Sequence, residues 1–296
     1  MAGRIRLSAV VLVLLLALSA CGSSKKTTSA TTGGGSLFSK LPSAIQSSKE
    51  IKVGSDIEYA PIEFYKEGTQ ELQGLDSDLA QAMGQKLGVK FTFVNDTDFA
   101  GIISALQAGR FDIIMSAMND TPERRGKGVD LVDYFTAGSS ILVQKGNPKA
   151  IKGVDDLCGV AVSVQKGTTQ DTDILTPQVA KCQAAKKALN VLRFEKDTDA
   201  LQQVKNGRAV ADLEDFPVAA YNASTSGGGK DFDVVTGQVG DIGSYGIAVP
   251  SKNTALRDSL QAALKAAVAD GTYDRILAGW HVSAGALTTT AINGGS

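Results

Sequence analysis

The sequence contains a single histidine, His281, and only three cysteines among 296 residues. Ser-His-Asp and Cys-His catalysis would both need that histidine, which stands beside Trp280 at the end of a predicted helix. No Cys-x-x-Cys or His-x-x-x-His spacing occurs, so no zinc site is expected. The sequence therefore argues against catalysis by zinc or histidine, and it predicts no metal and no cofactor.

An excess of basic residues is also absent, because 30 Lys+Arg face 31 Asp+Glu. If Arg4 and Arg6 are removed with a leader peptide, the net charge of −1 becomes about −3. This charge argues against a nucleic-acid-binding protein. The length predicts two domains rather than one.

The one long apolar stretch, Leu7 to Leu18, lies at the N-terminus after Arg4 and Arg6. It is too short to span a bilayer comfortably, and it has the layout of a signal peptide, predicted over 1–20. The stretch ends in Leu-Ser-Ala-Cys, which resembles the lipobox of bacterial lipoproteins, where Cys21 would carry a diacylglyceryl group. The alternative is a plain signal peptide with an incidental cysteine.

The segment after Cys21 is rich in Gly, Ser and Thr from 22 to 36. Such a segment buries too little apolar surface to offset the entropy of ordering. We therefore expect a flexible linker over 21–47 that holds the protein at the membrane surface.

From Ile51 onward, predicted strands and helices alternate. Leu75, Leu79, Met83 and Leu87 share one face of a predicted helix between strands at 51–55 and 90–94. A helix over 99–109 and a buried strand over 110–118 follow, and the same alternation recurs from 159 to 214. A further strand is predicted at 245–250, before two C-terminal helices. This order predicts an α/β fold with helices flanking each sheet.

The remaining cysteines, Cys158 and Cys182, form an even pair in a chain predicted to be exported. They are expected to form a disulfide, the alternative being two buried free thiols.

Candidate ligand-binding residues follow the predicted strands, where open α/β sheets place their ligands. They are Asp56, Tyr59, Ser116, Asn119, Arg124, Thr168, Thr169 and Asp215. An Arg fork matches a carboxylate, and an Asp can take an ammonium, so the set favours a zwitterion such as an α-amino acid. Taken singly, each residue also has a structural interpretation as a solvated helix face, a helix cap or a core aromatic residue.

The residues from about 51 to 280 resemble the extracytoplasmic solute-binding proteins of family 3, which deliver polar amino acids to ABC importers. The matching stretches include "VGSDIEYAPIEF", "ISALQAGRFDIIMSAMNDTPERR", "VSVQKGTTQD" and "LQQVKNGRAVADLEDFPVAAY", in the family's order. The cysteine pair, with "DLCG" before a central strand, resembles that of actinobacterial-type members. Asp120 departs from the family pattern, because an apolar residue is usual there.

The resemblance implies a two-lobed periplasmic-binding-protein-like fold of type II, with each lobe a sheet flanked by helices. Lobe 1 would comprise 48–137 and 241–296, and lobe 2 would comprise 138–240. Two hinge strands would cross near 136–140 and 237–243.

The resemblance also assigns roles to the candidate residues. Arg124 would hold the α-carboxylate with Thr168 and Thr169, and Asp215 would take the α-ammonium. Ser116 and Asn119 would add hydrogen bonds, whereas Tyr59 and Phe99 would enclose the ligand side chain. Asp56 would lie near the far end of the ligand, with Glu58 beside it, which favours basic or amide amino acids over acidic ones.

The implied partners are an amino-acid ligand, the transmembrane subunits of an ABC permease and the membrane reached through the lipid anchor. The protein would be a monomer at the extracytoplasmic face of the cell membrane. One alternative is an enzyme of the cyclohexadienyl or arogenate dehydratase kind, which would need an added general acid such as Glu58, Glu63 or Glu214. A sensor domain is a further alternative, and it would require a transmembrane helix and a signalling module.

Overall fold

The computed structural model describes residues 37–235 and 237–295. The predicted signal peptide, the predicted lipidation site Cys21 and the first part of the predicted linker lie outside the described residues. Within the described ranges, no helix combines the length and apolar character needed to cross a membrane.

The linker predicted over 21–47 is folded from residue 37 onward. Leu41 and Ile45 are buried against the main core, and α2 (Ser43–Ser48) leads directly into the first strand. Two apolar residues four positions apart give only a short helical signal, so the sequence pattern does not predict this helix. Flexibility is therefore not expected beyond residue 36.

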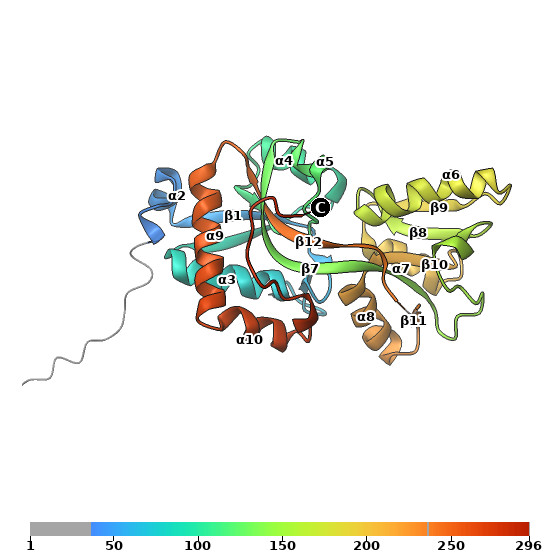
Figure 1. The fold of residues 1–296 in the computed structure, drawn as a ribbon. Coiled ribbons are helices and arrows are strands. Elements are labelled where there is room, and N and C mark those ends of the chain that lie inside the picture. The colour runs from blue at the N-terminus through green and yellow to red at the C-terminus, as the bar shows by residue number, and fades with distance from the viewer. Residues whose placement is uncertain (1–36, 236, 296) are drawn as a thin grey trace, which may run out of the picture. The chain divides into compact units, whose positions relative to one another are not determined.

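One large sheet runs through the described chain (Figure 1). Its strand order is β5-β1-β6-β12-β7-β10-β8-β9, with β11 beside β7. The sheet comprises β1 (Glu50–Ser55), β5 (Lys90–Asn95), β6 (Ile113–Ile114), β7 (Val129–Gln144), β8 (Ala161–Gln165), β9 (Asn190–Phe194), β10 (Ala211–Asp215), β11 (Phe232–Val234) and β12 (Val239–Pro250). The predicted α/β fold is confirmed, and its sheet contains parallel pairs: β1 runs parallel to β5 and β6, and β8 runs parallel to β9 and β10.

Two long antiparallel strands, β7 and β12, connect the two lobes (Figure 1). Their pairing extends from Val129 opposite Pro250 to Ser139 opposite Val239. From Ser139 onward β7 also pairs with β10, which belongs to the other lobe. The fold is therefore the two-lobed α/β fold of type II. The predicted boundaries after residues 137 and 240 fall inside these strands and stay a prediction.

Helices cover both lobes. The first lobe carries α3 (Leu75–Leu87), α4 (Ile102–Gln107), α5 (Pro122–Arg125), α9 (Thr254–Ala269) and α10 (Thr272–Gly279), and the second carries α6 (Thr176–Ala184), α7 (Asp197–Lys205) and α8 (Phe216–Thr225). A small antiparallel sheet of β2 (Glu58–Tyr59), β3 (Glu63–Tyr65) and β4 (Leu72–Gln73) lies in the first lobe.

The apolar stripe predicted for α3 forms the centre of the main core. Leu75, Leu79, Met83 and Leu87 are fully buried, and α3 packs against α9. Burying each such side chain stabilises the fold by about 1.5–3 kcal/mol. The helix ends at Gly88, whose φ of 71° is readily adopted only without a side chain. This packing holds the small sheet and the end of β1 in place beside the site.

Two predicted elements differ in form. The strand predicted over 110–118 is reduced to β6; beyond it Ala117 takes a left-handed φ of 43° that interrupts the pairing, and the chain pairs with β12 again at Asn119, opposite Tyr245. The helix predicted over 169–187 begins with a π-helical turn, Gln170–Leu175. Pro177 follows at the start of α6 and has no N–H to continue an α-helical hydrogen-bond ladder from that turn.

The predicted disulfide is confirmed between Cys158 and Cys182, whose Cα atoms lie 5.1 Å apart. It joins α6 to the 3₁₀ turn Val154–Leu157 in the second lobe.

Candidate functional site

A cavity lies between the lobes at the carboxyl ends of β1 and β8. Residues from the first lobe form most of its wall, and the remainder comes from the second lobe. The lining residues are Asp56, Glu58, Tyr59, Glu63, Phe99, Ser116, Ala117, Asn119 and Arg124 from the first, and Gln165, Thr168, Gln170 and Asp197 from the second. All the predicted site residues except Thr169 and Asp215 line this cavity.

Arg124 is held at the cavity by the short helix α5. Thr121 caps the helix by accepting the Arg124 backbone N–H at 3.3 Å, and Pro122 occupies its first position. The Arg124 guanidinium donates to the Asn119 carbonyl at 2.9 Å and to the Gly167 carbonyl of the second lobe at 3.2 Å. Burial lowers the pKa of Arg124 to about 10, so it remains charged at neutral pH. A buried cation therefore faces the cavity.

Phe99 lies against Arg124, with the guanidinium carbon 5.4 Å from the centre of the ring. Phe99 opens the 3₁₀ turn that precedes α4, and Asp98 caps that turn by accepting the Gly101 N–H at 3.0 Å. The capped turn thus fixes the backbone that carries the Phe99 ring.

Tyr59 and Asp215 connect the lobes directly. The Tyr59 hydroxyl donates to Asp215 Oδ2 at 3.2 Å and accepts the Asp215 backbone N–H at 2.9 Å. Gln170 Nε2 donates to the other Asp215 oxygen at 2.9 Å. Burial raises the pKa of Asp215 to about 6. Asp215 therefore does not line the cavity itself, but it is hydrogen-bonded to Tyr59 and Gln170, which do.

Thr169 is likewise behind the wall, because its hydroxyl donates to Asn119 Oδ1 at 3.0 Å. Thr168 does line the cavity, and its hydroxyl donates to the Gln165 carbonyl at 2.9 Å. The Gly-Thr-Thr turn thus contacts the first lobe through Arg124 and Asn119.

Asp56 makes a second direct contact between the lobes at the cavity. Its Oδ2 accepts Gln165 Nε2 at 2.6 Å, and its backbone N–H donates to the Ser116 hydroxyl at 3.0 Å. Burial, followed by repulsion from Glu58, raises the pKa of Asp56 to about 7. Glu58 itself accepts from Thr198 at 3.0 Å and lies 3.5 Å from Lys196 Nζ.

Glu63 is a buried acid that the sequence analysis named only for an enzymatic alternative. It accepts the Ser116 hydroxyl at 2.9 Å and is 1% exposed. Burial and the neighbouring Asp76 raise its pKa well above the usual range. Its place in β3 of the small sheet brings it to the cavity.

Three lining residues, Gln165, Gln170 and Asp197, were missed. The two glutamines flank the Gly-Thr-Thr turn, and that adjacency was the available signal. Asp197 opens α7, which reads in the sequence as an ordinary acidic helix start.

Asp197 also forms a buried group with Asp212 and Glu214. One ligand atom from each lies within 4.8 Å of the others, which is a spacing that could hold a metal ion. Asp212 accepts the Ser163 hydroxyl at 2.7 Å, and Glu214 accepts Asn222 Nδ2 at 2.9 Å.

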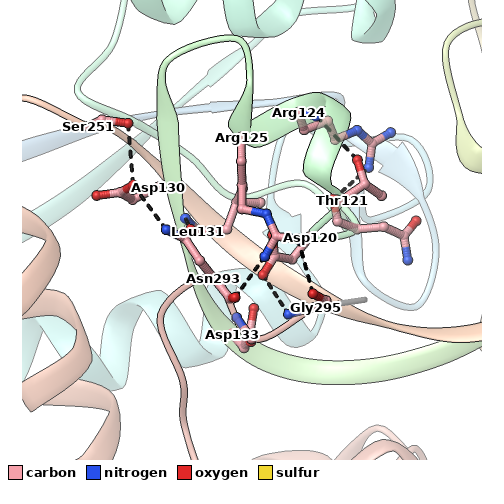
Figure 2. A network of polar contacts seen from close by, with 12 residues as sticks. Asp120, Thr121, Arg124, Arg125, Asp130, Leu131, Asp133, Ser251, Asn293 and Gly295 are labelled. Atoms are coloured by element: carbon pink, nitrogen blue, oxygen red, sulfur yellow. Dashed lines mark hydrogen bonds and ion pairs between the residues drawn. The ribbon is translucent and has the colours of Figure 1, made fainter.

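The C-terminal segment packs beside the loop that carries Arg124 (Figure 2). Arg125 donates to the Asn293 carbonyl at 2.7 Å and to the Gly295 carbonyl at 3.1 Å. Asn293 Oδ1 accepts the Leu131 backbone N–H at 2.8 Å, so the segment is joined to β7 as well.

Comparison with known proteins identifies a family and several similar proteins. Residues 51–283 match the bacterial extracellular solute-binding proteins, family 3. The arginine-binding protein ArgT of Corynebacterium glutamicum is 30% identical over 254 residues, covering 86% of this chain and 81% of that protein.

Two solved structures are similar over most of the chain. An ancestral arginine-binding protein bound to arginine has a TM-score of 0.70 at 36% identity, covering 78% of this chain and 98% of that one. An ancestral amino acid-binding protein, described as a precursor of cyclohexadienyl dehydratase, has a TM-score of 0.68 at 39% identity, covering 80% and 97%.

Proposed function

Because the chain belongs to the bacterial extracellular solute-binding proteins of family 3, we propose that it binds a polar or basic amino acid between its lobes and delivers it to an ABC permease. It is an amino-acid-binding component of an ABC transporter rather than an enzyme, as are its named relatives. The observation that carries the choice of ligand is the cavity itself, which is lined by one buried arginine and by the buried acids Asp56, Glu63 and Asp197.

Arg124 would bind the α-carboxylate, with Thr168 and Thr169 beside it. Two of the five guanidinium N–H groups already bond carbonyls, and those bonds set the direction of the fork. Asp215 would take the α-ammonium. Its carboxylate is hydrogen-bonded by the uncharged side chains of Tyr59, Tyr245 and Gln170, and it forms no salt bridge within the described residues. Its charge is thus available for a ligand cation.

Ser116 and Asn119 would contact the ligand from the first lobe, and Tyr59 and Phe99 would enclose its side chain. Asp56 would receive a cationic or amide group at the far end. An acidic side chain there would face Asp56 and Glu58, and burying an unpaired charge is costly. We therefore expect arginine, lysine, ornithine, histidine or glutamine ahead of glutamate and aspartate.

Calorimetric titration with the amino acids tests this ranking. Asp56→Asn should weaken arginine and lysine more than glutamine, because only the cations lose a charge partner. Asp199→Asn is the matched control, because Asp199 is an exposed acid in the first turn of α7 and does not line the cavity. Tight glutamate binding that does not respond to Asp56→Asn would show that this end of the cavity has another role.

A dehydratase activity is the second candidate, and Glu63 favours it. This cavity acid has a raised pKa, as a proton donor to a leaving group requires. Product analysis after incubation with prephenate or arogenate decides the matter. Turnover that is lost in Glu63→Gln would support the enzyme, and no turnover alongside amino-acid binding would reject it.

The membrane anchor is a further part of the proposal. Cleavage between Ala20 and Cys21 and lipidation of Cys21 would hold a monomer at the extracytoplasmic face of the cell membrane, close to the permease. Two acyl chains give stable anchoring where one does not. Cys21→Ser should release the protein or leave it unprocessed. Correct processing with unchanged membrane retention would contradict the anchor.

A further inference from the structure

Asp197, Asp212 and Glu214 form a buried acidic group behind the cavity wall. Asp212 and Glu214 are two positions apart on β10, so their side chains share one face of the sheet. Helix α7, which starts with Asp197, packs against β8 and β10. Of the three residues only Asp197 lines the cavity, so the group borders the cavity through this residue.

The group lacks enough donors among the described residues. Asp212 Oδ2 and Glu214 Oε1 are buried without a hydrogen-bond partner. Ser140, fully buried and directly opposite Glu214 in the strand register, also has a hydroxyl without a partner. Ser140 therefore supplies an unused polar atom on the same face of the sheet.

The charged groups around Asp197 are mostly acidic. Asp56 and Glu58 face it from the first lobe, Asp215 faces it from β10, and Glu214 of β10 shares a side-chain hydrogen bond with it. The neighbouring cation, Lys196, lies 3.5 Å from Glu58 Oε2 and is 44% exposed at its side chain. The acids in this part of the cavity could therefore be neutralised by a cationic group of the ligand.

We propose that Asp197 is a second carboxylate for the cationic side chain of the ligand, acting together with Asp56, and that binding of this cation releases protons from the buried acids to solvent. The proposal rests on the amino-acid-binding function and specifies which ligands the site prefers. A guanidinium presents five N–H donors and a fixed charge, so it can engage acids from both lobes. A glutamine amide has the donors but not the charge.

The titration of the two acids supports this. Burial is the main cause that raises the pKa of Asp56 to about 7 and that of Asp197 to about 8. A nearby ligand cation favours the ionised carboxylates and lowers both pKa values. Between about pH 6 and 8, arginine binding should therefore expel protons and strengthen as the pH rises. Glutamine shares only the α-ammonium, which faces Asp215 with its pKa of about 6, so it should release protons below about pH 7 and none above it.

Isothermal titration calorimetry of the protein with L-arginine and L-glutamine, in buffers of different ionisation enthalpy, tests the proposal. Above about pH 7, arginine affinity should rise by up to about tenfold per pH unit for each proton released, and glutamine affinity should stay level because Asp215 is already ionised there. Absence of proton release with arginine would overturn the proposal without any variant, which keeps the test valid if a variant fails to fold.

Asp197→Asn should weaken arginine by roughly tenfold or more, as expected for losing a charged hydrogen bond, and reduce proton release, while glutamine changes less than about threefold. Asp199→Asn is the matched control, because Asp199 is an exposed acid in the same first turn of α7. Equal losses for arginine and glutamine, or no loss, would overturn the role of Asp197. If the parent protein binds glutamine but not arginine, only this inference fails. If it binds no amino acid, the proposed function fails with it.

Discussion

The carboxylate of Asp120 accepts a hydrogen bond from the backbone N–H of Gly295 at 2.8 Å (Figure 2). Asp120 directly follows Asn119 at the cavity, and Gly295 lies beyond the part of the chain that matches the family. The bond explains why an acid stands where an apolar residue was expected. It also makes the C-terminal segment a support for the loop that carries Arg124.

Truncation after Thr290 should therefore weaken arginine binding by about tenfold, in addition to lowering thermal stability. The truncation removes both carbonyls that hold Arg125, and it leaves Asp120 buried beside Asp133 without the Gly295 donor. Calorimetry well below the melting temperature separates the two effects. Thr289→Ala, an exposed change in the same segment, is the control. Full affinity in the truncated protein would show that the segment only stabilises the fold.

Arg124→Lys should weaken arginine and glutamine by a similar factor, about 10- to 100-fold. Lysine keeps the charge but loses the planar fork, and each charged hydrogen bond contributes about 1.5–3 kcal/mol. Both ligands carry the same α-carboxylate, so titration should show parallel losses. Arg110→Lys is the control, because Arg110 is an exposed arginine that pairs with the buried Asp96 and does not line the cavity. A loss of affinity confined to arginine would show that Arg124 acts on the ligand side chain and not on the α-carboxylate.

Most of the cavity wall was predictable from the sequence because open α/β sheets expose the residues that follow their strands. Ser116, Arg124 and Thr168 each lie just beyond a strand or in the turn after one, and all three line the cavity. The buried stripe of α3 was also predictable, because the helical spacing of its apolar residues can be recognised within a short segment of sequence.

The rest of the site depends on contacts between segments that are far apart in the sequence. Gln165 reaches Asp56 across 109 positions of sequence, and Tyr59 reaches Asp215 across 156. The support from Asn293 to Leu131 spans 162 positions. No local pattern encodes such pairings, and Asp197 becomes a cavity residue only once α7 is placed against the first lobe.

Lobe closure should respond to ligand. Asp56 to Gln165 and Tyr59 to Asp215 are direct contacts between the lobes at the cavity, so opening the cleft must break them. Bending would fall near 136–140 and 237–243, where β7 and the start of β12 run between the lobes. Saturating arginine should reduce the radius of gyration in X-ray scattering. Arg124→Lys at the same ligand concentration should stay near the ligand-free value, and an unchanged radius in the parent would argue against a clamp.

Stability of the ligand-free protein should fall as the pH rises from about 5 to 8. Burial, reinforced by Asp197, raises the pKa of Asp212 well above the unfolded value of about 3.9. The folded state therefore holds a proton that the unfolded state has lost, and stability declines with pH until the folded pKa is passed. Asp212→Asn removes this titration while keeping the shape of the side chain beside Ser163. Urea unfolding at several pH values should give a slope that is shallower by up to about 1.4 kcal/mol per pH unit in the variant. Asp199→Asn, at an exposed position, should retain the parent slope. Parallel curves for the parent and Asp212→Asn would mean that Asp212 is ionised in the folded protein and that the buried group holds its charge by other means.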